Sequence, residues 1–452
     1  MTSAPKETLS VLDSVAIVVG VVVGVGIFKT PSIVASVADS GTMLVLFWLL
    51  GGFLSLVGAL CYAELASTHP SPGGDYHFLT KAFGPAAGFL YAWSRMTVIQ
   101  SGSIAMVAFL VGDHAAELFG LGPGANAPFA VGTVGILTTV NVLGITQGKR
   151  TQRLLVSVIL FGMLAVLSTS IGWAEPAREA AGRGWLPTGA ALGTAMIFVM
   201  LTYGGWNEAA FISAEVQAKR RNMVKVLLYS IAVVTGTYLL VNVALLRGLG
   251  LPAMAESRTV VADLAAAAMG GTGATVVTVL ILVAALSTVN ATIITGARTN
   301  YALGRDHRLF SFLGDWKERG STPVNALLVQ GAVATGLILV GAGSRDGFVM
   351  MIEYTAPVFW LFLLLTGLSL FVLRRRFPDA QRGFRVPLYP VTPVVFCLVC
   401  VYMLYAALAY TGTGSFIGVI VLLSGVPVLL VQRRCGVAKG EHREESERGS
   451  VP

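Results

Sequence analysis

Long apolar stretches, separated by short polar segments, recur from one end of the chain to the other. Most are about 20 residues long, the length that an α-helix needs to cross a hydrocarbon core of about 30 Å. Backbone polar groups inside a bilayer find no water to bond, so a spanning segment that is not part of a closed β-barrel must be helical. We therefore predict an all-α integral membrane protein with twelve transmembrane helices. The predicted spans are 10–36, 42–67, 86–111, 128–147, 154–173, 190–216, 224–246, 273–299, 324–342, 348–373, 391–411 and 414–432.

Two of these spans have unusual centres. The span 10–36 contains SVAIVVGVVVGVGIFKTPSIVAS, and the span 190–216 contains the polar cluster YGGWNE. Glycine weakens a helix by about 1 kcal/mol relative to alanine, so an uninterrupted lipid-facing helix has no reason to collect these residues. A small-residue packing face would explain Gly20 and Gly24, but it would not explain the polar cluster. The pattern predicts that the first and sixth helices are broken.

The two broken spans lie five helices apart, at corresponding positions in two five-helix halves. A repeat of five helices inverts its orientation in the membrane, and paired glycine breaks of this kind point to a binding site near the midplane. The predicted units are a first repeat over 1–173, a second over 174–373, and helices 11 and 12 over 374–438. The polar segment 439–452 (KGEHREESERGSVP) is predicted to be a disordered cytoplasmic tail.

The charge distribution predicts an orientation. Hydrophobic residues make up 55% of the chain and charged residues 12%, about half the charged share of soluble proteins. A net charge of +8 would suit a nucleic-acid partner, but 24 of the 31 Lys and Arg residues fall on the N-terminal side of the predicted membrane. By the positive-inside rule both termini are cytoplasmic and the protein lies in the cytoplasmic membrane. No nucleic-acid partner is predicted.

Metal and cofactor chemistry finds no support in the sequence. The five histidines and four cysteines show no ligand spacing, and the CxxC formed by Cys397 and Cys400 lies inside an apolar span, where it is read as ordinary helix sequence. No nucleophile, base and metal set converges either. We predict no metal, no cofactor and no enzymatic activity.

Five stretches match the motifs of a known family, in order across nearly the whole chain. They are GVGIFKTP (24–31), CYAELASTHPSPGGDYHFLTKAFGP (61–85), TYGGWNEAAFISAEVQAKRRN (202–222), LSTVNATIITGARTNYALGRD (286–306) and RRRFPDAQRGFRVPLYPVTP (374–393). Together they resemble the amino acid–polyamine–organocation transporters, and the third is most similar to the L-type amino acid transporter branch.

The resemblance implies a leucine-transporter-like fold, with two inverted five-helix repeats followed by two further helices. It also implies amino acids or related amines as substrates, moved by exchange or by coupling to a cation gradient. Animal members pair with a heavy chain through a cysteine after helix 3. This chain has no cysteine between Cys61 and Cys397, so no disulfide-linked heavy chain is expected.

The broken helices define the expected binding site. Unpaired backbone groups are costly away from water, and an amino acid would satisfy them. The amides of Val25, Gly26 and Ile27 would hold its carboxylate at a helix N-terminus, while carbonyls near 21–23 and 201–203 would accept its ammonium. The predicted substrate-binding residues are Val23, Gly24, Val25, Gly26, Ile27, Leu201, Thr202, Tyr203, Gly204, Gly205, Trp206 and Asn207. The resemblance implies a gate at 201–203, and Trp206 is either a packing residue or a direct contact.

Several polar residues near the breaks are candidates for coupling or gating. Glu208 is either a carboxylate favoured by a helix N-terminus, a proton-coupling group or a partner for a cationic substrate. Lys29 either supplies a fixed positive charge near the substrate, acts as a proton-linked switch, or extends outward to the membrane surface. Arg95 is expected to pair with a carboxylate, and Gln100 to face the site from the same helix.

Ser287 and Thr288 lie where sodium-coupled proteins of this fold place hydroxyl ligands, although their hydroxyls could equally bond back to the preceding helical turn. Some bacterial relatives carry a lysine in helix 5 at a sodium-like position, but the stretch TQRLLVSVILFGM (151–163) has none. The predicted function is secondary transport of amino acids, as an exchanger or a proton symporter. The alternatives are a transporter of amines, polyamines or cationic amino acids, and a sensor that binds amino acids without transporting them.

Overall fold

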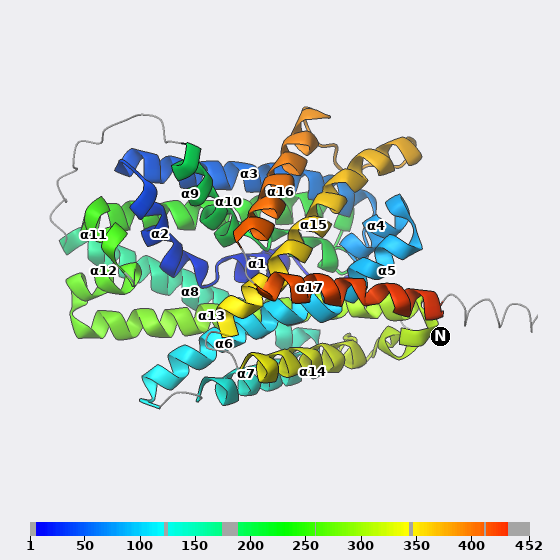
Figure 1. The fold of residues 1–452 in the computed structure, drawn as a ribbon, viewed down its shortest axis with the longest axis horizontal. Coiled ribbons are helices and arrows are strands. Elements are labelled where there is room, and N and C mark those ends of the chain that lie inside the picture. The colour runs from blue at the N-terminus through cyan, green and yellow to red at the C-terminus, as the bar shows by residue number, and fades with distance from the viewer. Residues whose placement is uncertain are drawn as a thin grey trace, which may run out of the picture.

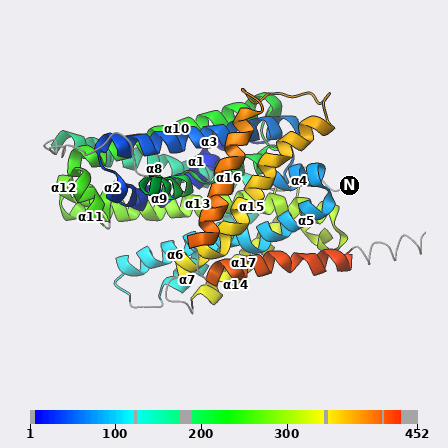
Figure 2. The same cartoon turned by 45° about the horizontal axis from the view of Figure 1, so that its top comes forward.

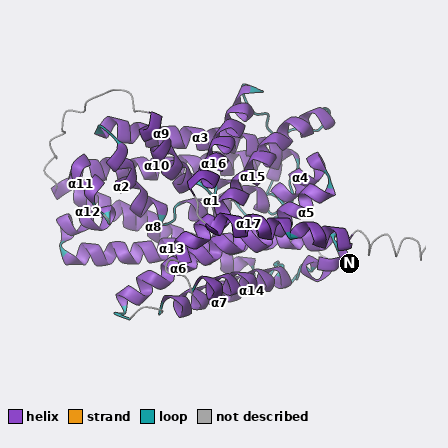
Figure 3. Cartoon of the chain, in the orientation of Figure 1, coloured by secondary structure: helices purple, strands orange, loops and turns teal. Residues whose placement is uncertain are grey.

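The computed structural model describes residues 6–121, 125–173, 189–257, 259–342, 347–410 and 413–432. Over these residues the chain is helical apart from short connections, as Figure 3 shows, and its only strand-like pairings are two isolated bridges. The predicted all-α class is confirmed. The predicted tail 439–452 lies outside the described residues.

The elements follow the predicted spans closely. The first half contains α1 (Val11–Val22), α2 (Gly26–Val37), α3 (Gly41–Thr68), α4 (Asp75–Phe83), α5 (Pro85–Ser94), the π-helix η1 (Arg95–Ile99), α6 (Gln100–Leu118), α7 (Asn126–Val142) and α8 (Ile145–Trp173). The second half contains α9 (Gly189–Tyr203), the 3-10 helix η2 (Trp206–Ile212), α10 (Lys219–Leu249), α11 (Leu251–Glu256), α12 (Val260–Met269), α13 (Gly271–Asp306), the 3-10 helix η3 (Arg308–Gly314), α14 (Val324–Gly341), α15 (Gly347–Arg376), α16 (Val391–Tyr410) and α17 (Thr413–Leu423). Each predicted span overlaps one helix or consecutive helical segments.

Many of these helices are long and apolar enough to cross a membrane. Among the described residues eight qualify singly, and the bent pair α1–α2 adds a ninth if it counts as one span. In Figure 1 the long helices α3, α10 and α13 run along the long axis of the molecule, and α15 and α16 cross them at a steep angle. The chain is therefore a multi-pass membrane protein.

The ends of the described chain lie on the same side of the bundle. In Figures 1 and 2 the N-terminus lies at the same end as the last turns of the red helix that follows α16, while α11 and α12 lie at the opposite end. This arrangement is what an even number of crossings produces.

Three predicted connections contain more helix than expected. Helix α8 begins at Ile145, so Lys149 and Arg153 lie in its first turns and not in a loop. Both side chains form ion pairs with Asp13 at 3.2 Å. These ion pairs stabilise the helical conformation of the basic segment. The connection 68–85 holds α4, and the segment after α10 holds α11 and α12. Short helices of this kind are too polar or too brief to form an apolar run.

Candidate functional site

The break in helix 1 lies between Val22 and Gly26. Helices α1 and α2 meet there at a bend of 49°, which confirms the predicted interruption. The first hydrogen bond of α2 runs from the Phe28 N–H to the Val25 carbonyl at 3.0 Å. The amides of Val25, Gly26 and Ile27 precede that bond and have no acceptor within the helix. They form the partly positive end of α2.

The break in helix 6 follows α9. Gly204 and Gly205 turn the chain, and Gly205 has a φ of +109°, which only glycine adopts readily. The continuation differs from the prediction. It is the seven-residue 3-10 helix η2, which ends at Ile212, where a longer half-helix to residue 216 was expected. Its i→i+3 bonding starts with the Glu208 N–H and the Gly205 carbonyl at 3.0 Å, and such helices are stable only as short pieces.

The two breaks pack directly against each other. A Cβ on Gly205 would lie 2.6 Å from Cγ1 of Val21, and one on Gly26 would lie 3.0 Å from Cγ2 of Thr202. Thr202 also donates a hydrogen bond of 2.8 Å to the Thr30 hydroxyl. The glycines therefore permit close approach of helices 1 and 6, and neighbouring side chains occupy the space where their own side chains would stand.

Tyr238 of α10 joins the end of α1 to the end of α9, which are the first halves of the two broken helices. Its hydroxyl lies 2.7 Å from the Val22 carbonyl oxygen and 3.0 Å from that of Thr202, and its ring packs on Tyr203 with centroids 5.0 Å apart. Both carbonyls fall in the segments predicted to cradle an ammonium group. Sequence reasoning missed Tyr238, because its only signal is one tyrosine within an apolar run.

Two predicted candidates prove to be partners. Arg95, in the π-helix η1, donates to both carboxylate oxygens of Glu208 at 3.1 and 2.7 Å, and its guanidinium lies 3.6 Å from the centroid of the Phe211 ring. The Gln100 amide also reaches Glu208 at 3.4 Å and donates to the Thr292 carbonyl at 2.7 Å. Arg95 and Glu208 are both buried, so each charge depends on the other for compensation.

The hydroxyls of Ser287 and Thr288 in α13 bond to α8 and α1 rather than to their own helix. Ser287 accepts from the Gln152 amide at 2.8 Å, and Thr288 donates to the Gly20 carbonyl at 3.1 Å. Gln152 is in turn held by Asn290 at 2.9 Å. An uncharged amide from α8 thus occupies the space between α1 and α13. Sequence reasoning missed Gln152, because the group expected in this stretch was a lysine.

The remaining predicted residues divide between the surface and the core. Lys29 is exposed, which favours the outward orientation over a fixed charge near the substrate. Leu201 is 48% exposed, whereas Thr202 and Tyr203 are buried. Trp206 packs on Tyr62 with ring centroids 5.2 Å apart, so its role in this conformation is packing.

A small pocket lies on the side of the helix 6 break that faces away from helix 1. Residues of α3, α15 and α16 line it, together with the helix 6 break; they include Leu54, Gly204, Gly205, Trp206, Asn207 and Trp360. Its walls are mostly apolar, and α1 and α2 contribute nothing to them.

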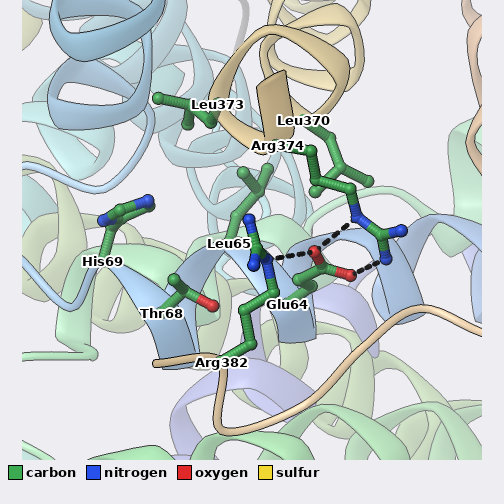
Figure 4. A pocket seen from close by; sticks show the side chains of 8 residues that line it. All are labelled: Glu64, Leu65, Thr68, His69, Leu370, Leu373, Arg374 and Arg382. Atoms are coloured by element: carbon green, nitrogen blue, oxygen red, sulfur yellow. Dashed lines mark hydrogen bonds and ion pairs between the residues drawn. The ribbon is translucent and has the colours of Figure 1, made fainter. Parts of the chain in front are cut away.

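Two of the motifs noted in the sequence meet at the end of the bundle where the N-terminus lies. Glu64 of α3 accepts hydrogen bonds from Arg374 at 2.7 and 2.5 Å and from the Val386 amide at 2.6 Å. Arg382 approaches the same carboxylate at 3.4 Å, as Figure 4 shows. The glutamate of the YAEL motif therefore anchors the arginine-proline connection between α15 and α16.

A multi-pass helical bundle with two broken helices packed against each other defines a membrane transporter of the broken-helix class. The model of the amino acid permease family matches residues 9–426. The chain belongs to this family, and it is a transporter of amino acids across a membrane, not an enzyme.

Curated relatives agree over nearly the whole chain. The b(0,+)-type amino acid transporter 1 of Homo sapiens is 26% identical over 439 residues, which cover 94% of this chain and 87% of that protein. The large neutral amino acids transporter small subunit 2 of Homo sapiens is 28% identical over 438 residues, covering 94% and 80%. The Asc-type amino acid transporter 1 of Mus musculus is 27% identical over 439 residues, covering 95% and 81%.

Proposed function

We propose that this protein exchanges neutral amino acids across the cytoplasmic membrane by alternating access, with the substrate held at the facing breaks of helices 1 and 6. The observation that carries the proposal is the set of three amides at Val25, Gly26 and Ile27, which precede the first hydrogen bond of α2. A helix N-terminus of this kind favours an anion. The α-carboxylate common to all amino acids is such an anion.

The ammonium group is assigned to carbonyls at the ends of α1 and α9. Tyr238 already lies between the Val22 and Thr202 carbonyls. An ammonium group would enter beside that hydroxyl and share the carbonyl oxygens with it. Leu201, which is the exposed member of the predicted gate, would then move to cover the substrate. The predicted contacts at 23–27 and 201–207 follow from this placement.

The Arg95–Glu208 pair favours neutral substrates over cationic ones. A cationic side chain needs an unpaired carboxylate, and the carboxylate of the helix 6 break itself, Glu208, is already held by both terminal nitrogens of Arg95. The curated relative described as a large neutral amino acids transporter is consistent with this preference. Amines, polyamines and cationic amino acids remain the alternative that the experiment must exclude.

The surrounding architecture is proposed on the same footing. Twelve spans, two inverted five-helix repeats over 1–173 and 174–373, and two further helices would place both termini in the cytoplasm. The common end of the first and last described residues supports an even number of spans, and the positive-inside rule assigns that end to the cytoplasm. A disulfide-linked heavy chain is not expected, because no cysteine lies between Cys61 and Cys397.

Purified protein in liposomes tests the proposal. Vesicles loaded with an unlabelled neutral amino acid should take up a labelled one, and empty vesicles should take up far less. The methyl ester of the same amino acid, which lacks the carboxylate, should not be exchanged. Preferred uptake of a decarboxylated analogue would favour the amine alternative. Binding without uptake or counterflow under every condition would favour a sensor and overturn exchange.

A further inference from the structure

A second buried carboxylate lies beside the Arg95–Glu208 pair. Asp75, the first residue of α4, is 2% exposed. One of its oxygens lies 2.9 Å from the Tyr62 hydroxyl and 3.4 Å from the Tyr91 hydroxyl. Its other oxygen, Oδ1, has no hydrogen-bond partner. Asp75 belongs to the GGDY part of the motif at 61–85.

The network contains one cation for two carboxylates. Arg95 directs both terminal nitrogens to Glu208, and its Nε has no partner. Tyr91 interacts with Arg95 as well as with Asp75, so a chain of hydrogen-bonding groups runs from Asp75 to Glu208. A buried carboxylate without a cation of its own is costly as an anion and binds a proton instead.

Other groups around Asp75 do not supply the missing charge. The elements packed on it contribute Tyr62 from α3, Tyr91 from α5, Arg95 from η1 and Glu208 from η2. From α15, Thr366 lies near Tyr62 and is uncharged. Two charged groups farther from Asp75 have other partners. Arg374 pairs with Glu64, and Asp306 accepts a hydrogen bond from Tyr76 of α4.

We propose that Asp75 is a proton-binding site that controls whether Arg95 stays paired with Glu208, and thereby controls movement of the helix 6 break. With Asp75 protonated, Arg95 has one anionic partner and holds η2 in place. When Asp75 releases its proton to water, the new carboxylate competes for Arg95 and weakens its hold on Glu208. This inference rests on the proposed function, since it gives the break a part in the transport cycle.

Burial raises the pKa of Asp75 to about 7, although Arg95 opposes that effect. The ordinary value is about 3.9, so between about pH 4 and 7 the folded protein holds a proton here that the unfolded chain has lost. This group therefore makes the folded conformation less stable as the pH rises through that window, and adds no further change above it.

Exchange in proteoliposomes should accelerate as the pH on both sides rises through about 7. Asp75→Asn, which mimics the protonated acid, should have a flat pH profile at the slow level of the acidic limb. Tyr62→Phe removes a donor to the carboxylate and should move the midpoint upward by about one pH unit. Asp113→Asn, at an exposed carboxylate of α6, is the matched control and should keep the wild-type profile.

Infrared difference spectroscopy between acid and alkaline pH provides a readout independent of transport. The carbonyl band of a protonated carboxylic acid should vanish with a midpoint near pH 7, and Asp75→Asn should lack it. If Asp75→Asn does not fold, the pH midpoint of the carbonyl band in Tyr62→Phe tests the proton site instead. A wild-type protein without this band, or an unshifted midpoint in Tyr62→Phe, overturns the proton site. If the wild-type protein shows the carbonyl band but no exchange at any pH, the proposed exchange function is overturned and the proton site is not.

Discussion

Arg95 and Glu208 lie 113 residues apart in the chain and form a two-pronged ion pair, with oxygen–nitrogen distances of 3.1 and 2.7 Å. Arg95 is only 1% exposed. The pair ties the π-helix of the third span to the first turn after the helix 6 break. The two residues, which the sequence presents as separate candidates, therefore act together to restrain η2.

Removing either member alone should be costly. Glu208→Gln and Arg95→Gln should each destabilise the protein by about 3–5 kcal/mol, because a buried charge loses its partner. The double variant should lose less than the sum of the two. Thermal unfolding in detergent of the wild type, both single variants and the double variant measures this coupling. Additive losses would show that the two residues do not act together, and Lys29→Gln, at an exposed position, should change little.

Tyr238→Phe should weaken the connection between the two breaks. The variant keeps the ring contacts with Trp48 and Tyr203 and removes only the hydroxyl near the Val22 and Thr202 carbonyls. We expect a stability loss of about 1 kcal/mol and altered affinity for the exchanged amino acid. Tyr229→Phe, at a 54% exposed position on the same helix, is the control. Equal behaviour of the two variants would remove Tyr238 from the site.

Gly205→Ala should be more damaging than an ordinary glycine substitution. Its φ of +109° costs an L-residue about 1–2 kcal/mol, and the added Cβ would lie 2.6 Å from Cγ1 of Val21. We expect a lower unfolding temperature and loss of exchange. Gly236→Ala in α10, where a Cβ meets nothing within 4 Å, should be neutral or slightly stabilising. Wild-type exchange by the Gly205 variant would contradict close packing of the breaks.

Exchange should not depend on sodium. The Gln152 amide donates to the Ser287 hydroxyl at 2.8 Å. This uncharged group therefore occupies the position between α1 and α13. Replacing external sodium by potassium should leave the initial rate within about twofold, since twofold is only about 0.4 kcal/mol. A rate that rises and saturates with sodium concentration would contradict this prediction, and loss of that dependence in Ser287→Ala and Thr288→Ala would assign the ion to the two hydroxyls.

Some features were predictable because they depend on local pattern alone. Apolar runs of spanning length predicted the helices, and the glycines at 24–26 and 204–205 predicted both interruptions. Helix ends were less accurate where polar residues continue a helix, as Lys149 does at the start of α8. The 3-10 form of η2 was also beyond reach, since no local signal distinguishes it from a short α-helix.

Hydrophobic length and glycine content act residue by residue, so the amino-acid sequence is enough to predict an all-helical membrane protein with breaks in two helices. Sequence also marks Arg95, Glu208, Ser287 and Thr288 as unusual in their surroundings. Which of these residues meet is fixed by helix packing. Pairing between Arg95 and Glu208, the bridge made by Tyr238 and the unmatched carboxylate of Asp75 all depend on contacts between distant segments. Such contacts arise from how whole helices pack, and no local pattern records them.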